Sequence, residues 1–238
     1  DVYAAPTAVS WSVLALQLHL PRLAVGRLVE RPADMSATID AFLDSEGRID
    51  VTDSLVTGYD FMQDGAEVGD TYLAAAGLDE GHRQRLMGND WTVDALRDLL
   101  SEGRFDLGFF AAHARHFVIE TPNNGFLRAS ELASALPDAA GKVAYGLACH
   151  AGLNTPGDHP EAIDFPEVWS RAGGTFIGST GWAYGFEEHL QYQERLMAEL
   201  TRQLAEPGGA AVGEALTAAK AAYYGDLDTL NHLHAKTL

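Results

Sequence analysis

The stretch DLGFFAAH, residues 106–113, is a continuous apolar run that ends on a histidine. A second run of this kind, KVAYGLAC at 142–149, ends on Cys149, the single cysteine of the chain. Continuous rather than alternating apolarity is typical of strands that are covered on both faces, as in a parallel sheet. The two runs therefore predict buried strands that each end on a reactive side chain.

The segment between the two runs contains a loop and one expected short helix, ASELASALP at 129–137. That is enough chain for one crossover between parallel strands, which requires a dozen or more residues. If the strands are neighbours, their ends lie about 5 Å apart. Ligands of open parallel sheets bind beyond the carboxyl ends of the strands, so His113 and Cys149 are expected at one functional edge.

Strand and helix patterns alternate along the rest of the chain. Further strands are expected at 20–28, 53–61 and 174–180, and helices at 34–47, 65–77, 91–103, 187–205 and 211–223. In the first of these helices, Met35, Ile39, Phe42 and Leu43 fall on one face. In the third, Thr92 is the expected N-cap and Gly103 the expected stop. This rhythm predicts an α/β layer fold with right-handed crossovers.

Composition limits the possible settings. The chain is 47% hydrophobic and lacks an apolar run of the roughly 18 residues that a membrane span needs. A formal net charge of -18 repels phosphate backbones and attracts cationic partners, so nucleic acid is not an expected partner. One cysteine excludes an internal disulfide framework. Because the first residue is Asp1, we expect a processed or excised chain.

Cys149 and His113 have the chemistry of a nucleophile and its proton carrier. Such a pair needs a thiolate and backbone N–H donors for the oxyanion, which the turns after both strands could supply. Two alternatives stay open. A lone cysteine at a strand end is often a small buried hydrophobe, and Cys149 with His150 could belong to a Cys/His zinc site. His116 competes with His113 as the partner, although His113 directly closes its strand.

Several stretches together resemble the gingipain-like cysteine peptidases, peptidase family C25, within the wider group of caspase-like folds. The resemblance runs from about Leu20 to the end of the chain. It rests on LPRLAVGRLVERPADMSATIDAFLD, H-x-x-H at 113–116, ACHAGLN, DFPEVWSRAGGTFIGSTGWAYG and the YQERLM helix. It implies a caspase-like three-layer α/β/α sandwich with a mostly parallel central sheet. Residues 1–47 would be the remnant or edge of a preceding α/β subdomain packed on the main domain, and 48–238 the peptidase domain.

The resemblance also implies roles for individual residues. Cys149 matches the nucleophile and His113 the catalytic histidine, and the backbone amides of Ala114 and Cys149 match the oxyanion hole. The family has glycine where Ala114 stands, so an alanine would be strained if the turn required a positive φ. Asp60 is the nearest match to the acidic residue that contacts the histidine.

Substrate-binding residues are implied in the same way. Asp64 lies near the position of the carboxylate that binds a basic P1 side chain, the residue before the cleaved bond. Asp60 and Asp64 could exchange roles or give way to Glu67, and Asp64 could equally be a helix N-cap. The loop after the third strand contains Ser179, Thr180 and Trp182, which match a wall of the P1 pocket; Trp182 could alternatively belong to the core.

The sequence therefore predicts a cysteine endopeptidase that works through an acyl-enzyme, with a possible preference for basic P1 residues. Its expected partner is a peptide or protein substrate. We expect no cofactor; calcium is conceivable from the acidic loops but no residue is assigned to it. The resemblance implies a secreted or cell-surface bacterial protein. Two other functions remain: a regulated caspase-like peptidase of the CHAT type, and a non-catalytic peptidase-like domain for surface adhesion.

Overall fold

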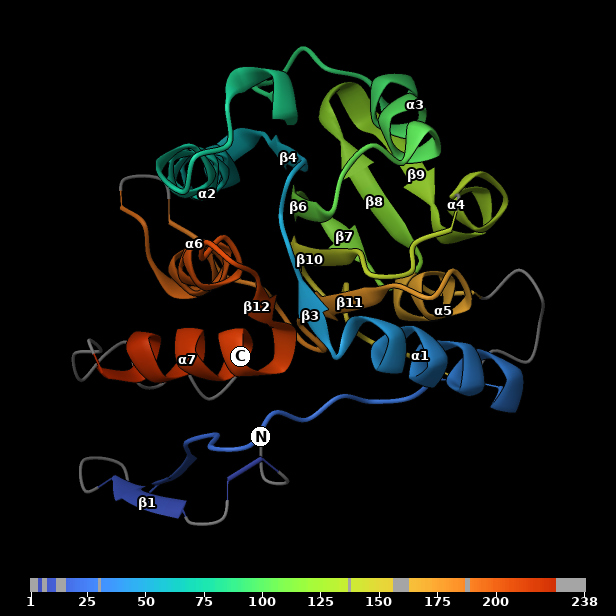
Figure 1. Ribbon diagram of the computed structural model, residues 1–238. Coiled ribbons are helices and arrows are strands. Elements are labelled where there is room, and N and C mark those ends of the chain that lie inside the picture. The colour runs from blue at the N-terminus through green and yellow to red at the C-terminus, as the bar shows by residue number, and fades with distance from the viewer. Residues whose placement is uncertain are drawn as a thin grey trace.

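The computed structural model describes residues 4–5, 8–11, 16–29, 31–136, 138–155, 163–186 and 189–225. At its centre is a five-stranded sheet in the order β11-β10-β6-β4-β5, in which every strand pair is parallel (Figure 1). The strands are β4 (Ser54–Gly58), β5 (Arg83–Met87), β6 (Leu107–Ala111), β10 (Val143–Leu147) and β11 (Thr175–Gly178). The predicted adjacency of the two apolar runs is therefore confirmed, with β6 and β10 side by side.

Helices cover both faces of this sheet (Figure 1). On one face lie α2 (Gln63–Ala75), α6 (Tyr192–Leu204) and α7 (Val212–Gly225). On the other lie α3 (Val93–Glu102), α4 (Ala129–Ala135) and α5 (Phe165–Arg171), with α1 (Pro32–Ser45) packed against α5. The expected α/β/α layer architecture is confirmed.

Burial explains why these strands were recognisable. Every residue of β4, β6 and β10 is buried, which is what their continuous apolar sequences indicate. In the core between β6, β10 and α6, Phe109 stacks on Tyr145 with ring centroids 4.8 Å apart. The Tyr145 hydroxyl is bonded to Thr201 Oγ1 at 2.6 Å. The sheet and α6 are thereby fixed to each other beneath the functional edge.

Helix α3 shows how the local sequence sets the element boundaries. The Thr92 side chain accepts a hydrogen bond from the Ala95 N–H at 3.2 Å, and the helix ends at Gly103 with φ 62°. Leu96 and Leu100 are buried on its inner face. The expected cap and stop are both present, because a threonine oxygen satisfies a free first-turn N–H and glycine tolerates a left-handed residue.

Smaller sheets complete the fold. A three-stranded antiparallel sheet, β7 (Ala114–Arg115), β8 (Val118–Thr121) and β9 (Gly125–Arg128), occupies the crossover between β6 and α4, where a loop was expected. Two further antiparallel pairs are β1 (Ala8–Trp11) with β2 (Leu16–His19), and β3 (Arg48–Ile49) with β12 (Ala210–Ala211). Three single turns of 3-10 helix lie at Asp60–Met62, Glu80–His82 and Pro122–Asn124.

The strand expected at 20–28 is wrong, since this run has no regular secondary structure in the described residues. Leu23, Val25 and Leu28 are exposed, at 57%, 56% and 43%. The helix that follows forms as expected and ends at Glu46, which adopts a left-handed conformation. Its apolar face is also largely in solvent, with Phe42 60% and Leu43 65% exposed. The division of the chain at residue 47 stays a prediction.

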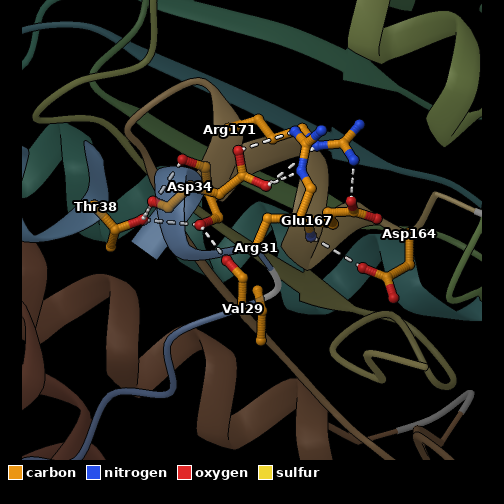
Figure 2. A network of polar contacts seen from close by, with 8 residues as sticks. Val29, Arg31, Asp34, Thr38, Asp164, Glu167 and Arg171 are labelled. Atoms are coloured by element: carbon orange, nitrogen blue, oxygen red, sulfur yellow. Dashed lines mark hydrogen bonds and ion pairs between the residues drawn. The ribbon is translucent and has the colours of Figure 1, made fainter. Parts of the chain in front are cut away.

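Polar contacts fasten α1 to α5 (Figure 2). Asp34 is buried and accepts from Arg31 Nε at 2.8 Å, and it also pairs with Arg171 at 3.5 Å. The hydrogen bond from Arg31 is the main reason that the pKa of Asp34 is lowered. The Ser170 hydroxyl is bonded to Thr38 Oγ1 and to the Val29 carbonyl, both at 2.8 Å. The segment before residue 47 is thus joined to the rest by buried and partly buried polar bonds.

No helix among the described residues is both long and apolar enough to cross a membrane.

Candidate active site

The pairing of β6 with β10 brings the two predicted catalytic residues to one edge. Ala111 and Leu147 are register partners, and the Ala112 N–H donates to the Leu147 carbonyl at 3.1 Å. His113 is two residues after Ala111, and Cys149 is two residues after Leu147. Parallel register therefore places both at the carboxyl end of adjacent strands, where a ligand of an α/β sheet binds.

His113 is held from the β4 side by Asp60 and two aromatic rings. Its Nε2 lies 3.3 Å from Asp60 Oδ2. The rings of Tyr59 and Phe61 contact the imidazole edge-on, with centroids 5.9 and 5.7 Å away. Tyr59 itself is buried and donates its hydroxyl hydrogen to the Glu120 carbonyl at 3.1 Å. The imidazole is thus packed by rings and has a carboxylate on one nitrogen.

Asp60 has a left-handed backbone, with φ 55°. Aspartate is one of the few non-glycine residues that tolerate this region. Its N–H donates to Asn89 Oδ1 at 3.2 Å, so the side chain of Asn89 supports this conformation. Asn89 was not predicted as a site residue. It comes two residues after β5, a strand missed from the sequence; recognising RQRLM as a strand would have marked Asn89 as an edge residue.

Cys149 is half-buried in a turn and contacts the loop after β11. The Ala183 N–H donates to Sγ at 3.4 Å, and Sγ lies 3.6 Å from the Ala183 carbonyl oxygen. No hydrogen bond joins Sγ to an imidazole among the described residues. Ala183, which the sequence did not single out, therefore fixes the thiol on the side away from His113.

The turn after Cys149 packs against β11 through backbone alone. The Gly152 N–H donates to the Ser179 carbonyl at 2.9 Å. A methyl group on Gly178 would lie 2.7 Å from the Gly152 nitrogen, and one on Gly152 would lie 2.2 Å from the Gly178 carbonyl oxygen. Only glycine fits this close approach on either side, so the two glycines set how near the thiol lies to the loop after β11.

Ala114 can offer its amide to the site. In an antiparallel ladder, hydrogen-bonded residue pairs alternate with non-hydrogen-bonded pairs. The Glu120 N–H donates to the His113 carbonyl at 2.8 Å, so the next pair, Ala114 with Ile119, is of the second type. Its N–H consequently points away from β8. Ala114 is not among the residues with positive φ, so the strain considered for an alanine here does not arise.

His150 contacts the loop after β11 through its side chain, and His116 contacts the start of α5 through its backbone. His150 has a positive φ of 55°, and its Nδ1 lies 3.2 Å from the Thr180 carbonyl oxygen. Its ring meets that of Trp182 edge-on at 5.0 Å. The His116 carbonyl accepts from the Phe165 N–H at 2.9 Å, at the start of α5. These contacts tie His150 to the loop after β11 and His116 to the first turn of α5.

The loop after β11 forms an exposed aromatic wall beside Cys149. Trp182 is 62% exposed, so it is not a core residue, and Tyr184 and Phe186 are exposed as well. Thr180 is exposed in the same loop, whereas Ser179 is buried and receives the turn after Cys149 through its carbonyl. The face of Trp182 is available to a flat or aliphatic ligand group.

Asp64 lies in the first turn of α2 and is not its N-cap, which is Met62. Its Oδ1 accepts from the adjacent Gly65 N–H at 2.7 Å. Glu67, the other alternative, is bonded to Gln63 on the same helix at 2.6 Å. Only Asp60 of the three acidic candidates contacts His113.

Glu194 is a buried acidic residue that the sequence gave no reason to notice. Its Oε2 accepts from the Phe186 and Gln191 N–H groups at 3.2 and 3.3 Å, which fixes the end of the aromatic loop to α6. Its Oε1 is buried and has no partner among the described residues. Burial, followed by the nearby charge of Asp64, raises the pKa of Glu194 to about 7.

Within the described ranges, no three His, Cys, Asp or Glu side chains converge as metal ligands. The Cys/His zinc alternative therefore has no support from this part of the chain. A cavity of about 430 Å³ lies between Asp50–Thr52 and Ala205–Pro207 and includes His82. It borders the amino ends of β4 and β5, whereas ligands of such sheets bind at the carboxyl ends. We place the candidate site at the Cys149 edge.

Solved structures of gingipains share this fold. The chain superposes on the complex of the pro- and mature domains of RgpB from Porphyromonas gingivalis, with TM-score 0.66 and 17% identity over 92% of the chain. It also superposes on the Arg-specific cysteine proteinase gingipain R (TM-score 0.67, 16% identity, 92% coverage) and on a structure described only as a protease (0.60, 15%, 99%). The chain spans 54% of the two gingipain chains and 56% of the third. No protein-family model and no curated protein matches it.

Proposed function

We propose that this chain is a cysteine endopeptidase in which Cys149 is the nucleophile and His113 carries the proton. One observation supports this most strongly: the register of β6 with β10 puts both side chains at the same two-residue offset beyond adjacent strand ends. Asp60, at 3.3 Å from His113 Nε2, would orient the imidazole. The likeness to gingipain structures supports a peptidase-like fold.

The reaction would proceed in two balanced steps. The Cys149 thiolate attacks the scissile carbonyl carbon, and the oxyanion accepts hydrogen bonds from the Ala114 and Cys149 N–H groups. The C–N bond breaks as the His113 imidazolium gives its proton to the leaving amine, which leaves a thioester. Water then attacks the thioester while His113 takes its proton. The products are the carboxylic acid half of the peptide and the free thiol.

A basic P1 residue is the specificity we propose. Asp64 is in the first turn of α2, Trp182 is exposed in the loop after β11, and one neighbouring structure is described as Arg specific, which together support this proposal. The net charge of -18 draws cationic peptides toward the chain. If Asp64 pairs with a P1 guanidinium, Asp64→Asn lowers kcat/KM for arginine peptides about tenfold or more, by about 1.4 kcal/mol. Glu67→Gln, one helical turn on, is the matched control.

Alkylation of Cys149 tests the enzymatic proposal against a non-catalytic surface domain. At about pH 6.5 the folded chain should react with iodoacetamide much faster than the same chain in urea, because an adjacent base activates a cysteine nucleophile. His113→Ala should abolish this excess rate, whereas His116→Ala should keep it. Cleavage of arginine or lysine peptides should vanish in Cys149→Ala. Slow labelling together with no Cys149-dependent cleavage would establish the non-catalytic alternative.

The partner we propose is a peptide or protein, and we propose no cofactor. A secreted or cell-surface location fits this activity, and the chain would meet its substrates there. A CHAT-type peptidase has the same dyad, so the cleavage experiment does not distinguish it from a gingipain-like peptidase. Flanking helical repeats in the parent chain would favour the CHAT type.

A further inference from the structure

A second cavity, of about 310 Å³, lies on the opposite side of His113 from Cys149. Its walls include His113, Asp60, Asn89, Glu120 and the turn Pro122–Asn124. We propose that this cavity binds the side chain of the residue that follows the cleaved bond, the P1′ residue, and that it takes a lysine or an arginine. The inference rests on the proposed peptidase function.

The order of the strands gives the position of the cavity. Along the carboxyl edge of the sheet, the segments follow in the order β11, β10, β6, β4, β5. The corresponding residues are Trp182, Cys149, His113, Asp60 and Asn89. The aromatic wall proposed for P1 is therefore on the Cys149 side, and the cavity is on the far side of the imidazole.

The chemistry of peptide cleavage determines which part of a substrate lies next to this cavity. The leaving amine must come to the His113 imidazole to receive its proton, and this nitrogen belongs to the P1′ residue. His113 itself forms part of the cavity wall. The P1′ side chain is attached to the Cα next to the leaving nitrogen, so it is the substrate side chain nearest to the cavity. The residues before the cleaved bond lie on the Cys149 side.

The chemistry of the wall favours a cation. Asp60 and Glu120 contribute carboxylates, and Asn89, Asn123 and Asn124 contribute amides, while no lysine or arginine lines the cavity. Both carboxylates lie close enough to the Tyr59 hydroxyl to help raise its pKa, after the larger effect of burial. Asp60 is already bonded to His113, whereas the Glu120 carboxylate has no hydrogen bond or ion pair among the described residues, so Glu120 would pair with a bound ammonium or guanidinium.

Two residues with a left-handed backbone shape the turn that borders the cavity. Asn123 and Asn124 have φ of 62° and 57°, and the Asn123 side chain donates to the Asn89 carbonyl at 3.2 Å. All three residues line the cavity, so this bond joins two parts of its wall. Non-glycine residues with such a backbone cluster at binding sites.

The test compares two kinds of substrate that share an arginine at P1. An arginine aminocoumarin amide has no P1′ residue and therefore reports on the proposed peptidase function alone. Quenched fluorescent peptides with lysine, glutamine or glutamate at P1′ report on the cavity. For the wild type we expect kcat/KM to be highest with lysine at P1′, lower with glutamine and lowest with glutamate. The value for lysine should exceed that for glutamine about fivefold or more. This preference should shrink in about 0.5 M salt.

Glu120→Gln should bring the lysine to glutamine ratio close to one, and Glu120→Lys should invert the lysine to glutamate preference. Glu80→Gln removes the same charge from an exposed site before β5 and should leave the ratios as in the wild type. If the coumarin amide is cleaved but the P1′ residue has no effect, or if Glu120→Gln keeps the ratio, the subsite is refuted and the peptidase stands. If neither substrate class is cleaved, the proposed function fails and the subsite with it.

Discussion

Glu194 offers a prediction that the structure makes quantitative. Its carboxyl group is fully buried, accepts two backbone hydrogen bonds through Oε2 and has no protein partner at Oε1 among the described residues. Its pKa in the folded chain is about 7, against an ordinary 4.5. The folded state therefore holds its proton more tightly than the unfolded state does, and ionising the group costs folding free energy.

The sign and size follow from proton linkage. Between pH 4.5 and about 7 the unfolded chain binds fewer protons at this site than the folded one, so this group lowers stability as the pH rises. Because proteins tend to precipitate near their isoelectric point, here about 4.7, we take about pH 5.5 as the lowest pH for the stability measurements. From there to a pKa of about 7, at about 1.4 kcal/mol per unit, the loss amounts to about 2 kcal/mol.

Glu194→Gln removes the titrating group while keeping an acceptor oxygen. We expect the free energy of unfolding of the variant, minus that of the wild type, to rise by about 2 kcal/mol from about pH 5.5 to about pH 8.5. Urea titrations followed by tryptophan fluorescence measure it. Leu204→Ala, a cavity-forming change on the same helix with no charge, should lower stability equally at both pH values. If the Glu194→Gln difference is the same at both pH values, the raised pKa is wrong.

Two further predictions concern the scaffold of the site. Asn89→Ala removes the bond to the Asp60 N–H. With the coumarin amide, which has no P1′ residue, kcat should fall about fivefold with little change in KM or thermal stability, because Asn89 then acts on His113 only through Asp60; an equal rise in KM with this substrate would contradict that role. Gly178→Ala forces a methyl group against the Gly152 nitrogen, so it should lower both the melting temperature and the rate of Cys149 alkylation. Gly77→Ala is the control: its added methyl group contacts no other atom, so the alkylation rate should stay unchanged.

Whether a strand could be predicted from the sequence depended on how it is buried. DLGFFAAH and KVAYGLAC belong to strands covered on both faces, so their sequences are apolar throughout and their adjacency followed from one crossover. The edge strand β5, RQRLM, begins with three polar or charged residues and is only partly buried, so it carries little of that signal. The run at 20–28 shows the reverse error: it is apolar, yet it is exposed and irregular.

The candidate site was predictable where a residue follows a recognisable strand. His113 and Cys149 were named as candidates because each ends such a strand, whereas Asp60 was named from the family resemblance. Asn89 was missed together with β5. Glu120 was missed because the small antiparallel sheet that places it was expected to be a loop, and no local pattern marks a two-residue strand such as β7.

The contacts that hold Cys149 and His113 have a consequence for the folding pathway. Cys149 is bonded to a residue 34 positions further along the chain, and His113 to one 53 positions before it. Contacts of such sequence separation form late, because the intervening chain must be ordered before they close. A newly made or partly unfolded chain thus lacks these contacts, which form only once the parallel sheet has closed. Under the proposed function, such a chain has no assembled catalytic pair and is therefore protected from cutting itself or its neighbours before it has folded.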